Sequence, residues 1–131
     1  MTSPRPRGLA VWVPPLIDLA VVTVFVLVGR RSHDEGSGAL DFLRVWWPFA
    51  AGLGVGGVLS GAWWFPFRWA RVAVMWGATV VVGMLLRISI QGRELKPSFV
   101  VVTTLFLGIF FFGWRLAARA LLVRRVRTRP R

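Results

Sequence analysis

One acidic residue, Asp18, interrupts the apolar run from Leu9 to Gly29. A carboxylate surrounded by hydrocarbon is costly unless it is neutralised or paired with a cation. Arg115, in the last apolar run, would lie at a similar depth if that run returns toward the same side, and its guanidinium offers a two-pronged partner. The pair could fix helix register as an intramembrane ion pair. It could instead form a proton or ligand site, or Asp18 could simply be interfacial.

A second polar cluster is expected at the opposite face. The loop RRSHDEGSGALDFLR, residues 30–44, supplies Arg30, His33 and Asp34, and Arg87 would end the third apolar run beside it. A histidine there could change charge near neutral pH. Adjacent side chains rarely give good coordination geometry, and one histidine does not make a zinc site. We therefore expect a solvated loop and no metal.

The remaining inventory argues against an enzyme. The chain has no cysteine, which excludes disulfides, thiolate metal sites and thiol catalysis. No GxSxG, P-loop or HExxH motif is present. Five acidic residues and one histidine leave little for acid–base chemistry. The sequence therefore predicts no enzyme and no cofactor; catalysis would have to come from Asp18, His33 or a partner protein.

The elements that position these residues are four apolar runs. They predict an all-α, polytopic membrane protein with four transmembrane helices in an antiparallel up-down bundle. The helices are expected at about 10–30, 45–65, 70–87 and 97–123, within a single transmembrane domain, residues 1–123, followed by a basic tail, residues 124–131. Pro66 is expected to end the second run. The third run, Val72 to Leu86, spans only about 22 Å at 1.5 Å per residue, so its flanking arginines would have to snorkel, or the run could be re-entrant.

Glycines recur at helical spacing in the second run and favour close helix contacts. Gly52 with Gly56, and Gly57 with Gly61, form two GxxxG pairs, and Gly83 contributes to a small-residue surface on the third run. Packing within one chain is the simpler use of these positions. Dimerisation is the alternative.

The charge distribution predicts orientation. The formal net charge is +12, and basic residues are more numerous on the side that would hold both termini, which we therefore expect in the cytoplasm. The C-terminal tail is expected to contact anionic lipid headgroups, and membrane topology explains the arginines without nucleic acid. Interfacial tryptophans are expected at the inner side as Trp12, Trp63, Trp64, Trp69 and Trp114, and at the outer side as Trp46 and Trp47, with Trp76 in the core.

An ordered set of short motifs resembles the uncharacterised membrane-protein family called domain of unknown function 3054, over roughly Leu16 to Leu116. The set comprises Asp18, the GRRSH segment 29–33, Trp47-Pro48-Phe49 with Gly52, the series Trp76, Thr79, Gly83, Leu86 and Arg87, and Phe99 followed by Gly113-Trp114-Arg115. The resemblance implies four membrane helices and no known activity. The arginine-rich tail lies outside it.

Taken together, these features predict a multi-pass protein of the plasma membrane. Its expected function is binding through helix packing, as an accessory protein to a membrane partner or as a homo-oligomer. The alternative is a small transporter or channel-like protein that uses Asp18 as a titrating or substrate-contacting group.

Overall fold

Four α-helices make up the computed structural model, which describes residues 11–32, 38–92, 94 and 96–127. They are α1 (Val13–Ser32), α2 (Ala39–Ser60), α3 (Trp69–Ser89) and α4 (Pro97–Arg127). No strand occurs in these ranges. The prediction of an all-helical chain is confirmed.

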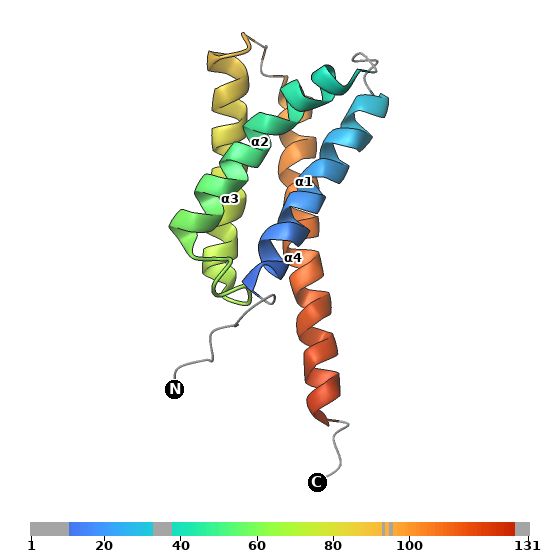
Figure 1. The fold of residues 1–131 in the computed structure, drawn as a ribbon, viewed down its shortest axis with the longest axis vertical. Helices are drawn as coiled ribbons and strands as arrows, with labels where there is room; N and C mark the ends of the chain where they lie inside the picture. Colours follow the sequence, from blue (N-terminus) through green and yellow to red (C-terminus); the bar gives the residue numbers. More distant parts are fainter. Residues whose placement is uncertain (1–10, 33–37, 93, 95, 128–131) are drawn as a thin grey trace.

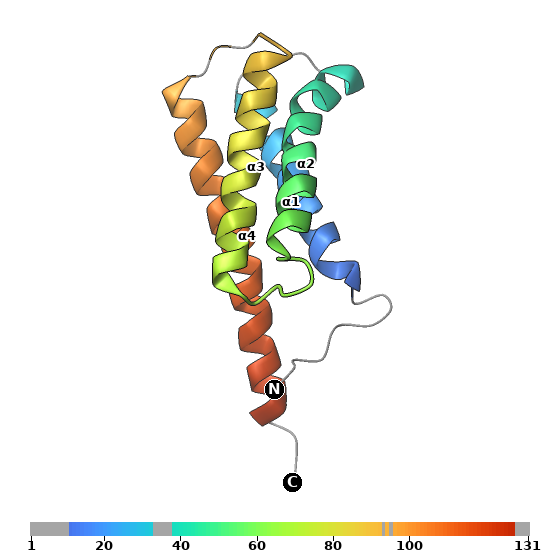
Figure 2. The same cartoon turned by 90° about the vertical axis from the view of Figure 1, so that its left-hand side faces the viewer.

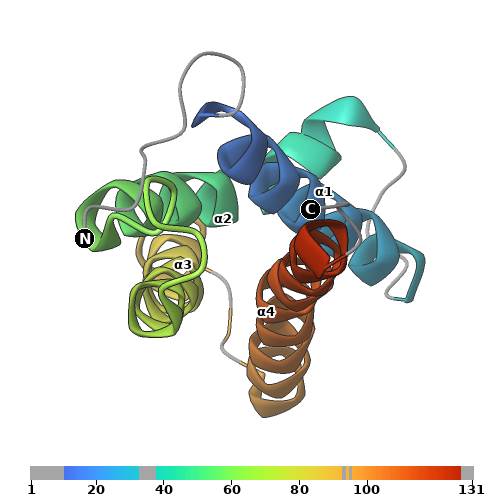
Figure 3. The same ribbon diagram turned by 90° about the horizontal axis from the view of Figure 1, so that it is seen from below.

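Successive helices run in opposite directions, as the colour order along each ribbon shows (Figure 1). Each helix contacts its neighbours in the chain, and α1 also contacts α4, so that the four surround a common centre (Figures 2 and 3). The α2–α3 pair is by far the most extensive contact. The C-terminal part of α4 continues well beyond the ends of the other helices (Figure 1).

The outer surface of this arrangement is apolar. Helices α2, α3 and α4 are long and apolar enough to cross a membrane, and α1 contains a shorter apolar stretch, Val13–Gly29. Only about a third of the most apolar window of each long helix is buried, so most of its apolar side chains face outward. The exposed ones include Leu27 on α1, Val55 and Leu59 on α2, Val74 and Val81 on α3, and Leu105 and Ile109 on α4. Such a surface suits a lipid environment.

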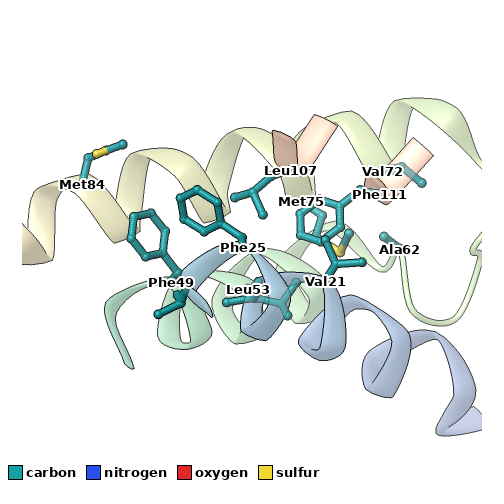
Figure 4. Packing of buried hydrophobic residues seen from close by; sticks show 12 residues of the cluster. Val21, Phe25, Phe49, Leu53, Ala62, Val72, Met75, Met84, Leu107 and Phe111 are labelled. Carbon is teal, nitrogen blue, oxygen red and sulfur yellow. The ribbon is translucent and has the colours of Figure 1, made fainter. Parts of the chain in front are cut away.

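The interior is filled by aliphatic and aromatic side chains from all four helices (Figure 4). Phe25 of α1 meets the edge of Phe49 of α2, with ring centroids 5.4 Å apart. Leu107 and Phe111 bring α4 into the same cluster, and both are completely buried. In a lipid environment, which would be as apolar as these side chains, such a cluster would stabilise the fold mainly through close packing.

Glycines on α2 explain its tight contact with α3. A Cβ at Gly52 would lie 2.9 Å from the carbonyl oxygen of Thr79, and one at Gly56 would lie 2.9 Å from that of Met75. Missing side chains at these two positions therefore let the backbones approach directly. Gly83 faces α2 in turn, since its Cβ would overlap the ring of Phe49.

Two helix boundaries differ from the sequence-based expectation for the second run. Helix α2 begins at Ala39, earlier than expected, because polar residues such as Asp41 and Arg44 are accommodated in its first turns. It ends at Ser60, before Pro66, because Gly61 adopts the left-handed conformation (φ 71°, ψ 14°) that closes a helix C-terminus.

The third helix is not short. Trp69–Ser89 comprises 21 residues, or about 31 Å at 1.5 Å per residue, which is close to the hydrocarbon thickness. The value of about 22 Å applied only to the uncharged run, whereas the expected helix, about 70–87, already contained Arg71 and Arg87 and agrees with the observed bounds to within two residues. Nη1 of Arg71 donates a hydrogen bond of 3.1 Å to the carbonyl oxygen of Ser60, at the end of α2. Helix α4 likewise extends past residue 123, so part of the expected tail is helical.

Candidate functional site: the Asp18 cluster

Asp18 and Arg115 form an ion pair inside the helix assembly. Asp18 lies in the second turn of α1 and Arg115 in the second half of α4, and both side chains are completely buried. Nη1 of Arg115 lies 2.8 Å from Oδ1 of Asp18, and Nη2 lies 2.7 Å from Oδ2. The contact therefore has the parallel, bidentate geometry that is strongest for arginine and carboxylate.

Two tryptophans complete the environment of the carboxylate. The indole N–H of Trp114 donates to Oδ1 at 2.9 Å, and that of Trp63 donates to Oδ2 at 3.0 Å. Each oxygen of Asp18 thus accepts two hydrogen bonds. An ionised carboxylate has about four lone-pair sites, so the described donors fill its whole accepting capacity. We call Asp18, Trp63, Trp114 and Arg115 the Asp18 cluster.

Local backbone features hold the donors in place. Trp114 and Arg115 are consecutive on α4, and the guanidinium lies 4.4 Å from the centroid of the Trp114 ring. Nη1 of Arg115 also donates to the carbonyl oxygen of Phe111, one turn earlier, at 3.0 Å. Trp63 lies in the connection after α2, and its indole occupies the space that a side chain at Gly57 would need. The missing side chain at Gly57 thus makes room for the indole of Trp63.

The second glycine of this pair has a different role. Gly61 supplies the left-handed turn that sends the chain back toward Trp63, and Nη1 of Arg71 occupies the place of its missing Cβ. Ser60 supports the same turn, because its Oγ accepts a hydrogen bond of 3.1 Å from the backbone N–H of Ala62. Both glycines of the second GxxxG pair therefore contact segments of their own chain.

The chemistry open to the Asp18 cluster is limited. Its two charges neutralise one another, and a proton or ligand at Asp18 would have to displace a donor already in place. One donor is left over, since Nε of Arg115 is buried without a hydrogen-bond partner in the described part of the chain. Among the same residues, no group of three His, Cys, Asp or Glu side chains could hold a metal ion. The arrangement connects α1, α4 and the α2–α3 connection.

The cluster expected at the opposite face is only partly described. His33, Asp34 and the side chain of Arg30 lie outside the residues whose side chains the structure describes. Arg87 is described, and its guanidinium lies 4.6 Å from the centroid of the Phe99 ring, at the start of α4. This contact joins α3 to α4. The proposed grouping of these four residues stays a prediction.

Sequence reasoning did not anticipate the role of the tryptophans. Trp63 and Trp114 were expected at the interface because of their type, yet their N–H groups point at Asp18. Trp46 similarly donates to Oγ1 of Thr23, and Trp76 donates to the carbonyl oxygen of Thr104. Trp76, expected in the core, is half-buried between α3 and α4. Each of the four indoles thus joins two helices, or a helix and a connection. Trp114 could have been predicted from the sequence, because it adjoins Arg115 and its indole N–H would therefore lie at the same membrane depth as Asp18.

The fold and the cluster define a class: an all-helical protein whose apolar helices suit a membrane and whose buried polar residues join helices. The chain belongs to the family described as "Protein of unknown function (DUF3054)", whose model matches residues 15–118. This confirms the resemblance carried by the motifs from Asp18 to Arg115. No curated protein and no solved structure matches the chain.

Proposed function

We propose that this protein is a multi-pass protein of the plasma membrane that acts by binding, through contacts of its helices with a membrane partner or with further copies of itself. All four helices present apolar side chains outward, which leaves extensive surface for lipid and for other helices. The buried glycine pairs are used within the chain, so such contacts would involve the outward faces.

The burial and hydrogen bonds of Asp18 are the main support for this proposal. A transporter that uses Asp18 as a titrating or substrate-contacting group needs a carboxylate with free accepting capacity or a ready exchange of donors. Asp18 is completely buried and accepts four hydrogen bonds, two of them from Arg115. These contacts favour a role in holding the helices together over a role in transport.

The charges support an orientation with both termini in the cytoplasm. Described arginines at the end shared by the α2–α3 connection and the end of α4 are Arg68, Arg71, Arg119, Arg124, Arg125 and Arg127. No described acidic residue accompanies them except the buried Asp18. At the opposite end, the described basic residues are accompanied by two acidic ones, Asp41 and Glu94; the basic residues there are Arg30, Arg31, Arg44, Arg87 and Lys96. Basic excess near membrane helices marks the cytoplasmic side.

Disulfide cross-linking in native membranes tests the binding role, and the absence of cysteine from the chain makes it free of background. Single cysteines would replace one outward residue on each helix, namely Leu27, Val55, Val74 and Ile109. Met75→Cys serves as the matched control, because it adjoins Val74 in the sequence but is completely buried.

If the protein forms homo-oligomers, oxidation should give a dimer band at one or two of the outward positions and none with Met75→Cys. If it serves as an accessory protein whose partner has a cysteine at the contact, a larger band that depends on one outward face should contain that second protein, identifiable by mass spectrometry. A chain that stays monomeric and unlinked at all four positions, while reconstituted vesicles show solute flux abolished by Asp18→Asn with folding intact, would instead establish the transport alternative.

A further inference from the structure

An open groove lies where α4 extends past the other helices. Its volume is about 490 Å³, and its lining residues are Phe67 of the α2–α3 connection and Arg119, Leu122, Val123, Val126 and Arg127 of α4. The five α4 positions follow the spacing i, i+3, i+4, i+7 and i+8, so they form one face of the helix. The groove therefore combines an apolar strip with an arginine near each end.

This face continues the side of α4 that packs into the protein. Phe111 and Arg115, one turn apart and both completely buried, precede Arg119 on the same side of the helix. Beyond Arg115, Leu122, Val123 and Val126 are all at least 45% exposed. Figures 1 and 2 show the reason, since α4 here projects beyond the ends of α1, α2 and α3. The face of α4 that is buried at Phe111 and Arg115 thus continues to Val126, where no described helix packs against it.

The lining indicates the chemistry of the occupant. Arg119 and Arg127 are exposed, and neither forms an ion pair with a described acidic residue. Asp41 and Glu94 lie at the other end of the molecule, and Asp18 is already paired. Guanidinium groups bind phosphate through paired N–H donors. The groove is also lined by apolar side chains, among them Phe67, Leu122 and Val126. A ligand that fills it must therefore have an apolar part as well as a phosphate, and a free phosphate ion has none.

We propose that this groove binds one anionic phospholipid of the surrounding leaflet. Its phosphate lies against Arg127, and its glycerol and upper acyl segments lie along Phe67, Leu122 and Val126 toward Arg119, which is about 12 Å away along the helix and adds positive charge to the groove. The inference rests on the proposed membrane insertion with this end at an anionic leaflet. It goes further by assigning the lipid to a defined groove rather than to the diffuse charge of the tail.

Native mass spectrometry of the full chain in mild detergent tests the site. The protein would be titrated with phosphatidylglycerol and, separately, with phosphatidylcholine of identical acyl chains. Arg119→Gln with Arg127→Gln removes the groove charges. Arg124→Gln with Arg125→Gln is the matched control, because it removes two charges from the same helical segment outside the groove lining. Leu122→Trp, with all charges retained, fills the apolar strip.

Each arginine near an anionic lipid contributes about five-fold to affinity. We expect the wild type to retain phosphatidylglycerol selectively, the groove double variant to lose at least about ten-fold in affinity, and the control double variant to change by about two-fold or less. Leu122→Trp should also weaken retention. Equal losses in the two double variants would overturn the groove and leave only diffuse attraction. No selectivity in the wild type would rule out any preference for anionic lipid. Neither result affects the cross-linking pattern, so failure here is distinct from failure of the proposed function.

Discussion

The indole N–H of Trp63 lies 3.0 Å from Oδ2 of Asp18, although 45 residues separate the two in the chain. Trp63 belongs to the connection between α2 and α3, whereas Asp18 belongs to α1. The hydrogen bond therefore ties the end of the tight α2–α3 pair to the first helix. Trp114 and Arg115 tie α4 to the same carboxylate. One acidic side chain thus serves as the common acceptor for three segments.

Replacing Asp18 should destabilise the protein strongly. Asp18→Asn removes the charge that compensates the buried Arg115, and it turns an amide N–H₂ toward donors that need an acceptor. Breaking a buried ion pair by removing one partner costs about 3–5 kcal/mol. We expect a large fall in the thermal unfolding midpoint of the detergent-solubilised chain, measured by circular dichroism. Wild-type thermal stability would show that the pair contributes little.

Removing both charges should be milder than removing one. In Asp18→Leu with Arg115→Met, no buried charge is left unpaired, and apolar replacement of a buried pair is often neutral. The double variant should therefore unfold at a higher temperature than Asp18→Asn in the same detergent. Because the N–H groups of Trp63 and Trp114 still lose their acceptor, we expect recovery to be incomplete.

Trp63→Phe should also reduce stability, through a single hydrogen bond. A bond to a charged group contributes about 1.5–3 kcal/mol, and phenylalanine keeps most of the ring packing against Gly57. Trp64→Phe is the matched control, since Trp64 is 42% exposed and its indole makes no hydrogen bond to the described residues. Equal effects of the two substitutions on the unfolding midpoint would contradict the assigned role of Trp63.

Gly54 and Gly56, two residues apart on α2, should respond differently to alanine. Gly56→Ala places a methyl group 2.9 Å from the Met75 carbonyl oxygen and should destabilise the α2–α3 contact by about 1–3 kcal/mol. Gly54→Ala meets nothing within 4 Å and should be neutral or stabilise the helix by up to about 1 kcal/mol. Thermal unfolding of the two variants in one detergent compares them directly. A neutral or stabilising Gly56→Ala would mean that the helices are not in close contact at Gly56.

The proposed orientation predicts which end of α3 is accessible from outside the cell. Single cysteines would replace Arg68, just before α3, and Ser89, its last residue; both side chains are exposed. A membrane-impermeant maleimide should label Ser89→Cys in intact cells and label Arg68→Cys only after permeabilisation. Labelling of Arg68→Cys alone in intact cells would reverse the orientation, and labelling of both would argue against a membrane crossing by α3.

Residue type and depth were enough to foresee some of the candidate site but not the rest. The ion pair between Asp18 and Arg115 could be predicted from the sequence, because an isolated carboxylate in an apolar run needs a cation and few cationic residues lie within the apolar runs. Trp63 could not, because its position depends on where α2 ends. The sequence alone predicts that α2 ends at Pro66. The helix ends at Ser60 instead, because Gly61 adopts the left-handed conformation. The uncharged run of the third helix, Val72 to Leu86, underestimated its span, whereas the expected helix, about 70–87, already included Arg71 and Arg87 and lies close to the observed Trp69–Ser89.

The sequence by itself determined the helical class, the family and the presence of one acid that needs a partner. These follow from the long apolar runs, from the ordered motifs and from the cost of burying charge. Only the tertiary structure decided how that acid is satisfied. The four hydrogen bonds to Asp18 come from residues 63, 114 and 115. Hydrogen bonds depend on distances of about 3 Å and on direction, and these are set by how helices and turns pack rather than by the order of residues along the chain.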